Sequence, residues 1–90
     1  MNKIYIASYD LSEPNRDYEG VGGALASCGE VKRVQQSVWL IATSSTAVEI
    51  RDAVKPFLEG EDSFFVTQLD IQDWAGWRTR AQAWISEHAG

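Results

Sequence analysis

The order of strand-like and helix-like segments constrains this 90-residue chain more than any other feature of its sequence. Runs of β-branched and aromatic residues are typical of strands, and apolar residues three or four positions apart are typical of helices. The strand-like segments are residues 3–11, 30–35, 37–43 and 63–69, and the helix-like segments begin near Asp17 and Thr46. The right-handed crossover rule leaves few ways to fold this order. We predict the ferredoxin-like βαββαβ arrangement, an α+β fold with both helices on one face of an antiparallel sheet.

Local signals support these boundaries. Pro14 lies in the polar loop that closes the first strand, and proline is excluded from central strands. Asp17 is a candidate N-cap for the first helix. A short turn around Gln36 makes the second and third strands a hairpin. Thr46 and Glu49 are spaced as a capping box for the second helix.

The C-terminal segment carries a separate helical pattern. Apolar or aromatic residues fall on one face of a helix at Trp77, Ala81, Trp84 and Ile85, with Trp74 one turn earlier. We therefore predict an amphipathic C-terminal helix. Residues 1–72 are expected to form the ferredoxin-like domain, and residues 73–90 a helical tail of the same domain.

The strands are apolar on both faces, which a sheet open to water on one side would not be. In the third strand, Val38 and Leu40 point one way, and Trp39 and Ile41 the other. Something must cover the face that the two helices leave bare, because a large exposed apolar patch marks an interface. We expect a homodimer through the sheets, with interface residues Tyr9, Trp39, Ile41, Trp77 and Trp84. The alternative is a monomer whose own residues 74–88 cap the face.

Charge and composition narrow the possible partners. The net charge is −5, whereas strong nucleic-acid binding usually requires a basic surface. Arg16, Lys32 and Arg33 form the best basic cluster and could contact RNA or DNA phosphates weakly, although solvated surface charge is the plainer interpretation. The single cysteine, Cys28, cannot form an internal disulfide. With no signal-peptide pattern and no apolar run of about 20 residues, we expect a cytoplasmic protein without membrane contact.

Three stretches resemble a known family when taken in order. They are "YIASYDLSEP", "GEVKRVQQSVWLI" and "AVEIRDAVKPFLEGEDSFFVTQL", which together cover about residues 3–69. This order is similar to the small CRISPR-associated ferredoxin-like nucleases, the second adaptation protein of those systems. The resemblance extends to virulence-associated protein D-like toxins and to uncharacterised SinR-family-like proteins. The tail "DWAGWRTRAQAWI" is more similar to those uncharacterised members.

The resemblance implies a sheet-to-sheet homodimer and a role for Asp10. In the CRISPR-associated proteins, the aspartate that ends the first strand lies near the dimer axis and has been proposed to hold a divalent metal with its symmetry mate. Some members are assigned metal-dependent nuclease activity, and others act as a platform for DNA. On this basis Asp10 is the candidate catalytic and metal-binding residue, with Mg²⁺ or Mn²⁺ as the candidate ion.

Physical chemistry gives Asp10 two possible roles. Two carboxylates about 4 Å apart repel by roughly 4 kcal/mol at an effective dielectric near 20, so a symmetric pair would need a cation or a shared proton. Oxygen ligands suit Mg²⁺ and Mn²⁺. Alternatively, Asp10 caps the loop that begins at Ser12, as aspartates commonly do in turns.

Three functions remain open on the sequence. The net negative charge favours an interaction module that binds a second copy or another protein and has no strong catalysis. The alternatives are a metal-dependent endoribonuclease that uses Asp10 and a nucleic-acid-binding scaffold. A divalent-dependent RNA-cleavage assay of the wild type against Asp10→Asn separates the nuclease from the other two.

Overall fold

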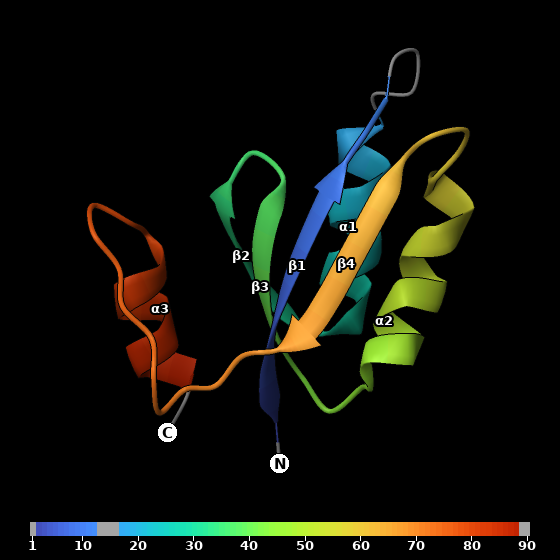
Figure 1. The fold of residues 1–90 in the computed structure, drawn as a ribbon. Coiled ribbons are helices and arrows are strands. Elements are labelled where there is room, and N and C mark those ends of the chain that lie inside the picture. The colour runs from blue at the N-terminus through green and yellow to red at the C-terminus, as the bar shows by residue number, and fades with distance from the viewer. Residues whose placement is uncertain (1, 13–16, 89–90) are drawn as a thin grey trace.

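The structure, a computed structural model, describes residues 2–12 and 17–88. Along the chain it forms four strands, three α-helices and one 3₁₀ turn (Figure 1). The elements are β1 (Lys3–Asp10), α1 (Tyr18–Cys28), β2 (Glu30–Gln35), β3 (Val38–Thr43), α2 (Ala47–Val54), η1 (Lys55–Phe57), β4 (Ser63–Gln68) and α3 (Ala81–His88). In this part of the chain, no helix has the length and apolar character needed to cross a membrane.

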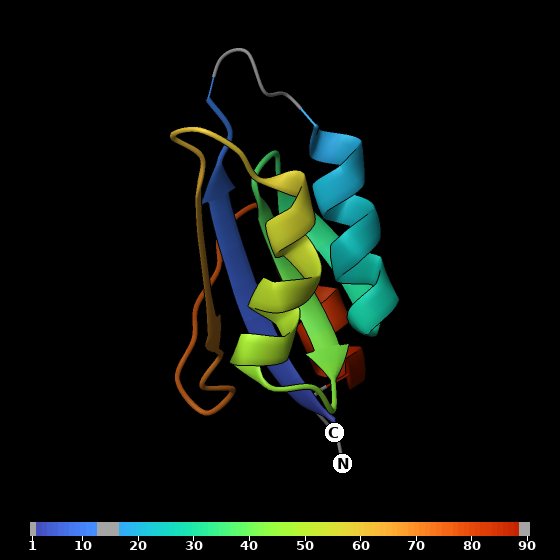
Figure 2. The same cartoon turned by 90° about the vertical axis from the view of Figure 1, so that its right-hand side faces the viewer.

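The four strands form one sheet in the order β2-β3-β1-β4, with every neighbouring pair antiparallel. Helices α1 and α2 cover the same face of this sheet (Figure 2). This is the predicted ferredoxin-like α+β fold, and the prediction is confirmed. The central strand β1 pairs with β3 on one side and with β4 on the other.

The helix caps predicted from the sequence are present in the structure. Asp17 caps α1 by accepting a hydrogen bond of 2.9 Å from the Gly20 amide. Thr46 and Glu49 make both bonds of the capping box at the start of α2. Each bond satisfies an amide that would have no partner inside its helix.

The face of the sheet under α1 and α2, called here the helix face, carries the main core. Alternate residues of β1 and β3 point into it and meet the apolar sides of the two helices. The core residues are Tyr5, Ala7, Tyr9, Leu11, Val21, Ala24, Leu25, Ile41, Ile50 and Val54.

The opposite face, called here the open face, carries a second and smaller core. Trp84 and Ile85 of α3 pack against Ile4, Leu40 and Ala42 of β1 and β3. The segment after β4 runs from the β4 side of the molecule to the β2 side, where α3 lies (Figure 1). The chain's own tail therefore covers part of the open face, as in the alternative that the sequence left open.

The tail is less helical than predicted. Helix α3 begins only at Ala81, and the preceding residues follow turns and irregular backbone. Arg78 has a left-handed φ of 54°, which a continuous helix cannot contain. The Thr79 hydroxyl then accepts a 3.1 Å hydrogen bond from the Ala81 amide. The prediction of a helix that includes Trp74 and Trp77 is thus wrong before Ala81, because the backbone reverses at Arg78.

Candidate functional site

Asp10 is the last residue of β1, and its side chain is exposed. It lies opposite Ser63 of β4 and, with Ser8, points to the open face. Within the described residues, no three His, Cys, Asp or Glu side chains gather where they could hold a metal ion. The proposed metal and catalytic roles of Asp10 thus stay predictions.

The loop after β1 is fixed by a different aspartate. Asp62 Oδ1 accepts hydrogen bonds from the Ser12 amide at 2.6 Å and from the Ser12 hydroxyl at 2.8 Å. Asp62 Oδ2 accepts a further bond of 2.9 Å from the Glu59 amide. These bonds tie the end of β1 to the turn before β4. The capping role considered for Asp10 at Ser12 therefore belongs to Asp62.

The three basic residues predicted to contact nucleic acid do not form one described cluster. Lys32 and Arg33 are neighbours in β2, so their side chains point to opposite faces of the sheet. Arg33 donates from Nε and Nη2 to the Gln36 carbonyl oxygen at 3.1 and 2.8 Å, and its guanidinium lies 5.7 Å from the centre of the Trp39 ring. Arg16 lies outside the described residues.

Three residues predicted at a sheet-to-sheet interface lie on the helix face instead. Ile41 is fully buried and Tyr9 is 5% exposed, both within the main core, and Trp39 packs against that core. Trp39 Nε1 donates a 2.8 Å hydrogen bond to the Tyr9 hydroxyl. Burial raises the pKa of Tyr9, and the Trp39 bond opposes that rise. These side chains hold α1 to the sheet, so the open face does not present them to a second subunit.

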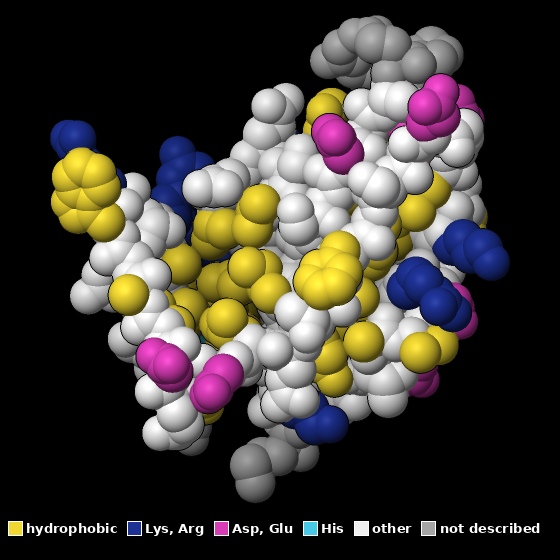
Figure 3. Space-filling view, viewed as in Figure 1, with side chains coloured by type: hydrophobic (Ala, Val, Ile, Leu, Met, Phe, Trp, Pro, Cys, Tyr) yellow, Lys and Arg dark blue, Asp and Glu magenta, His cyan; other side chains and the backbone are white. Residues whose placement is uncertain are grey.

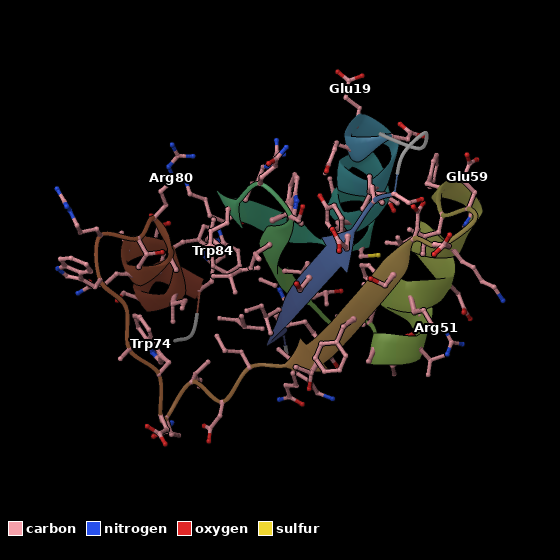
Figure 4. All side chains as sticks on the ribbon, turned by 45° about the horizontal axis from the view of Figure 1, so that its top comes forward. Glu19, Arg51, Glu59, Trp74, Arg80 and Trp84 are labelled. Atoms are coloured by element: carbon pink, nitrogen blue, oxygen red, sulfur yellow. The ribbon has the colours of Figure 1, made fainter. Side chains whose placement is uncertain are left out.

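The two tail tryptophans have opposite environments. Trp84 is 9% exposed, and its ring centroid lies 4.1 Å from that of His88 in a stacked arrangement. Figure 4 shows Trp84 between α3 and the sheet. Trp77 is 83% exposed, with the Arg78 guanidinium 5.6 Å from its ring centre. Trp84 therefore holds the tail within its own chain, and only Trp77 stays available to a partner.

A groove of about 350 Å³ lies between the open face and the tail. Its wall is formed largely by apolar residues of the sheet and the tail, including Ile6, Val38, Leu69, Trp74, Trp77 and Ile85. In the space-filling view, hydrophobic side chains gather in this hollow (Figure 3). The groove falls within the size range of small-molecule sites.

A second cavity of about 500 Å³ adjoins the groove at the β2–β3 hairpin. Arg33, Arg78 and Arg80 line it with Gln36, and it shares Val34 and Gln35 with the groove. Three of the five arginines in the chain therefore line one cavity. Sequence reasoning missed Arg78 and Arg80 because it placed them on the polar face of a helix that does not form there.

His88 connects α3 to the edge of β2. Its Nδ1 lies 2.9 Å from the Trp84 carbonyl oxygen, and its Nε2 lies 2.8 Å from Glu30 Oε2. Both ring nitrogens thus face acceptors, an arrangement that only the protonated imidazolium satisfies at both positions. The Trp84 carbonyl and then the Glu30 carboxylate raise the pKa of His88, with a smaller contribution from Glu87.

We expect this contact to make the stability depend on pH. Because the folded pKa lies above the unfolded value near 6.5, the contribution is complete below that value and is lost as the pH rises through the folded pKa. Urea unfolding of the wild type and of His88→Gln should differ at pH 5.5 and converge at pH 9. An equal difference at both pH values would contradict this account. His88 is the only histidine of the chain, so its ring signals can be titrated directly by NMR.

Comparison with known proteins supports the fold. No family model matches the chain. Among solved structures, the crystal structure of the hypothetical protein TT1823 from Thermus thermophilus is similar, with a TM-score of 0.60 and 25% sequence identity. The match covers 78% of this chain and 84% of that one. The chain therefore shares its small α+β fold with this protein, and the similarity brings no activity with it.

Proposed function

We propose that this protein is an interaction module without chemistry of its own, and that it forms a homodimer by pairing β4 with β4 of a second copy. The observation that carries this proposal is the character of β4. It is an edge strand, and its sequence, Ser63–Gln68, contains no charge and no proline. An unprotected edge of this kind is a template for pairing with another chain.

The other edge of the sheet differs in its charge and in the regularity of its pairing. Strand β2 carries Glu30, Lys32 and Arg33, and its pairing with β3 is irregular between Arg33 and Gln35. Charged side chains and bulges are the usual devices that protect an edge from association. The protein thus protects β2 and leaves β4 open.

Backbone groups on the free side of β4 are suitably placed for pairing. The Leu69 amide donates to the Ile4 carbonyl oxygen at 2.8 Å. Since bonded and non-bonded pairs alternate along an antiparallel ladder, Phe64, Val66 and Gln68 direct their amides away from β1. Antiparallel pairing with a second β4 would satisfy these groups and extend the sheet across a two-fold axis.

Apolar side chains flank the same edge. Phe65 is 65% exposed and Val48 of α2 is 55% exposed. Both line a hollow of about 220 Å³ between β4 and α2, together with Ala47, Arg51, Phe64 and Val66. A second copy would bury these exposed groups, and each Å² of apolar surface removed from water contributes about 25 cal/mol. The sequence resemblance implies a homodimer through the sheet faces, so it supports a two-copy assembly but not this choice of edge.

Light scattering coupled to size-exclusion chromatography tests this proposal. The wild type is expected at about 20 kDa, twice the chain mass of 10.0 kDa. Phe65→Lys places two like charges near the two-fold axis and removes exposed apolar surface, so it should shift the protein toward 10 kDa. Gln82→Lys adds the same charge on α3, away from β4, and should leave the dimer intact. A monomeric wild type at 100 µM, or a Phe65→Lys protein that still dimerises, would rule out pairing through β4.

A further inference from the structure

We propose that the groove and the adjoining arginine cavity together form a binding site for a nucleoside phosphate, with the base in the groove and the phosphate on the arginines. The site lies on the β2 side of the sheet, whereas the proposed dimer uses the β4 edge. The inference therefore goes beyond the interaction module and does not depend on it.

The cationic half of the site is lined by Arg33, Arg78 and Arg80. In the described ranges, no carboxylate forms an ion pair with Arg78 or Arg80. Among the residues that the structure describes, no Asp or Glu lines either the groove or the arginine cavity. This is unexpected in a chain with 13 acidic and 8 basic residues. Arginine forms paired, planar hydrogen bonds to phosphate oxygens, so a cavity lined by three arginines favours a phosphate ligand.

The apolar half of the site offers aromatic surface. Trp74 and Trp77 both line the groove, and Trp77 is almost fully exposed although it is a large apolar residue. The Arg78 guanidinium lies over the Trp77 ring, which places a cation directly beside this aromatic surface. Planar bases stack on exposed aromatic rings, and stacking accepts every base because each has a π-face.

The two halves are joined, which favours one ligand that spans both. Val34 and Gln35 of the hairpin line both cavities. In Figure 4, Arg80 extends from the tail just before α3, and Trp74 lies farther back along the same segment. In Figure 3, the hydrophobic hollow has basic side chains at its border. A base linked to a phosphate matches this arrangement, in which an apolar surface adjoins a cationic one.

Overall charge favours a small ligand over a long nucleic acid. A polymer would place many phosphates near a protein with a net charge of −5, and repulsion would offset the local attraction. A mononucleotide brings only one to three phosphates, so the net charge of the protein opposes its binding far less. We therefore assign the site to a nucleoside mono-, di- or triphosphate.

Isothermal titration calorimetry of the full chain tests the assignment with AMP and GMP as probes. Both nucleotides should bind, whereas adenosine, which lacks phosphate, and ribose 5-phosphate, which lacks a base, should bind at least tenfold more weakly. Phenyl phosphate tests whether any small aromatic phosphate suffices. Equal affinity for phenyl phosphate and AMP, or no nucleotide binding at 5 mM, would overturn the proposal. Binding of an oligoribonucleotide of eight nucleotides without binding of mononucleotides would also overturn the proposal.

Exposed positions allow clean variants of the site. Arg80→Ala and Trp77→Ala should each weaken AMP binding about tenfold or more, because they remove a phosphate contact and a stacking surface respectively. Lys55→Ala is the control for loss of a positive charge, since Lys55 is exposed on η1 and lines neither the groove, the arginine cavity nor the hollow beside β4. It should bind AMP as the wild type does. Unchanged affinity in both site variants would show that AMP binds elsewhere. The light-scattering result for β4 is independent of each of these outcomes.

Discussion

Replacing Trp84 with alanine is expected to lower the free energy of unfolding by about 3–5 kcal/mol, the usual cost of removing a buried tryptophan. Trp84 is 9% exposed and packs with Ile85 against Ile4, Leu40 and Ala42. Without its ring, α3 loses its main contact with the open face, and apolar surface becomes accessible to water. We expect a midpoint of thermal unfolding lower by more than 10 °C and increased binding of the dye ANS.

Trp77→Ala is the matched control for this experiment. The same residue type is removed from the same tail, but at a position that is 83% exposed. Surface substitutions of this kind usually change stability by no more than about 0.5 kcal/mol. If the two variants unfold at the same denaturant concentration, the tail does not cover the open face in solution.

Replacing Gly29 with alanine is expected to destabilise the protein by about 3 kcal/mol, the upper part of the usual range for overpacking. Gly29 lies between α1 and β2, where a Cβ atom would collide with the backbone carbonyl oxygen of Ala42 and lie 3.1 Å from Thr43 Cβ. Thr43 itself is held in place by a 2.6 Å hydrogen bond from its hydroxyl to the Cys28 carbonyl oxygen. The neighbouring backbone therefore has little freedom to move away. Urea denaturation followed by circular dichroism measures the loss.

Gly23→Ala should change stability in the opposite direction. Gly23 lies inside α1, is exposed, and has no atom within 4 Å of the position that a Cβ would occupy. Alanine is favoured over glycine in a helix interior by about 0.5–1 kcal/mol, so this variant should unfold at a higher urea concentration. Equal stability of the two alanine variants would contradict the close packing at Gly29.

The local signals identified the elements well because each depends on neighbouring residues. Asp17 and the Thr46–Glu49 pair cap their helices within three residues of the chain. The period-two alternation in β1 and β3 correctly separated residues such as Leu40 from residues such as Ile41. The same alternation could not say which set the helices would cover, because both sets are apolar.

The tail shows why the candidate site was harder to predict. The spacing of Trp77, Ala81 and Trp84 is helical, yet the backbone reverses at Arg78 and only the last two lie in α3. Arg78 and Arg80 line the same cavity as Arg33, which lies more than 40 positions earlier in the sequence. No local pattern links residues so far apart.

The sequence by itself determined the order of strands and helices, their caps, and the presence of two apolar faces on one sheet, because backbone propensity and side-chain period act over a few residues. Only the tertiary structure decided which face each apolar set joins, that Trp84 covers the open face from within the chain, and that three arginines line one cavity beside an apolar groove. These outcomes depend on the path of residues 69–80 across the molecule, and packing between distant segments determines that path.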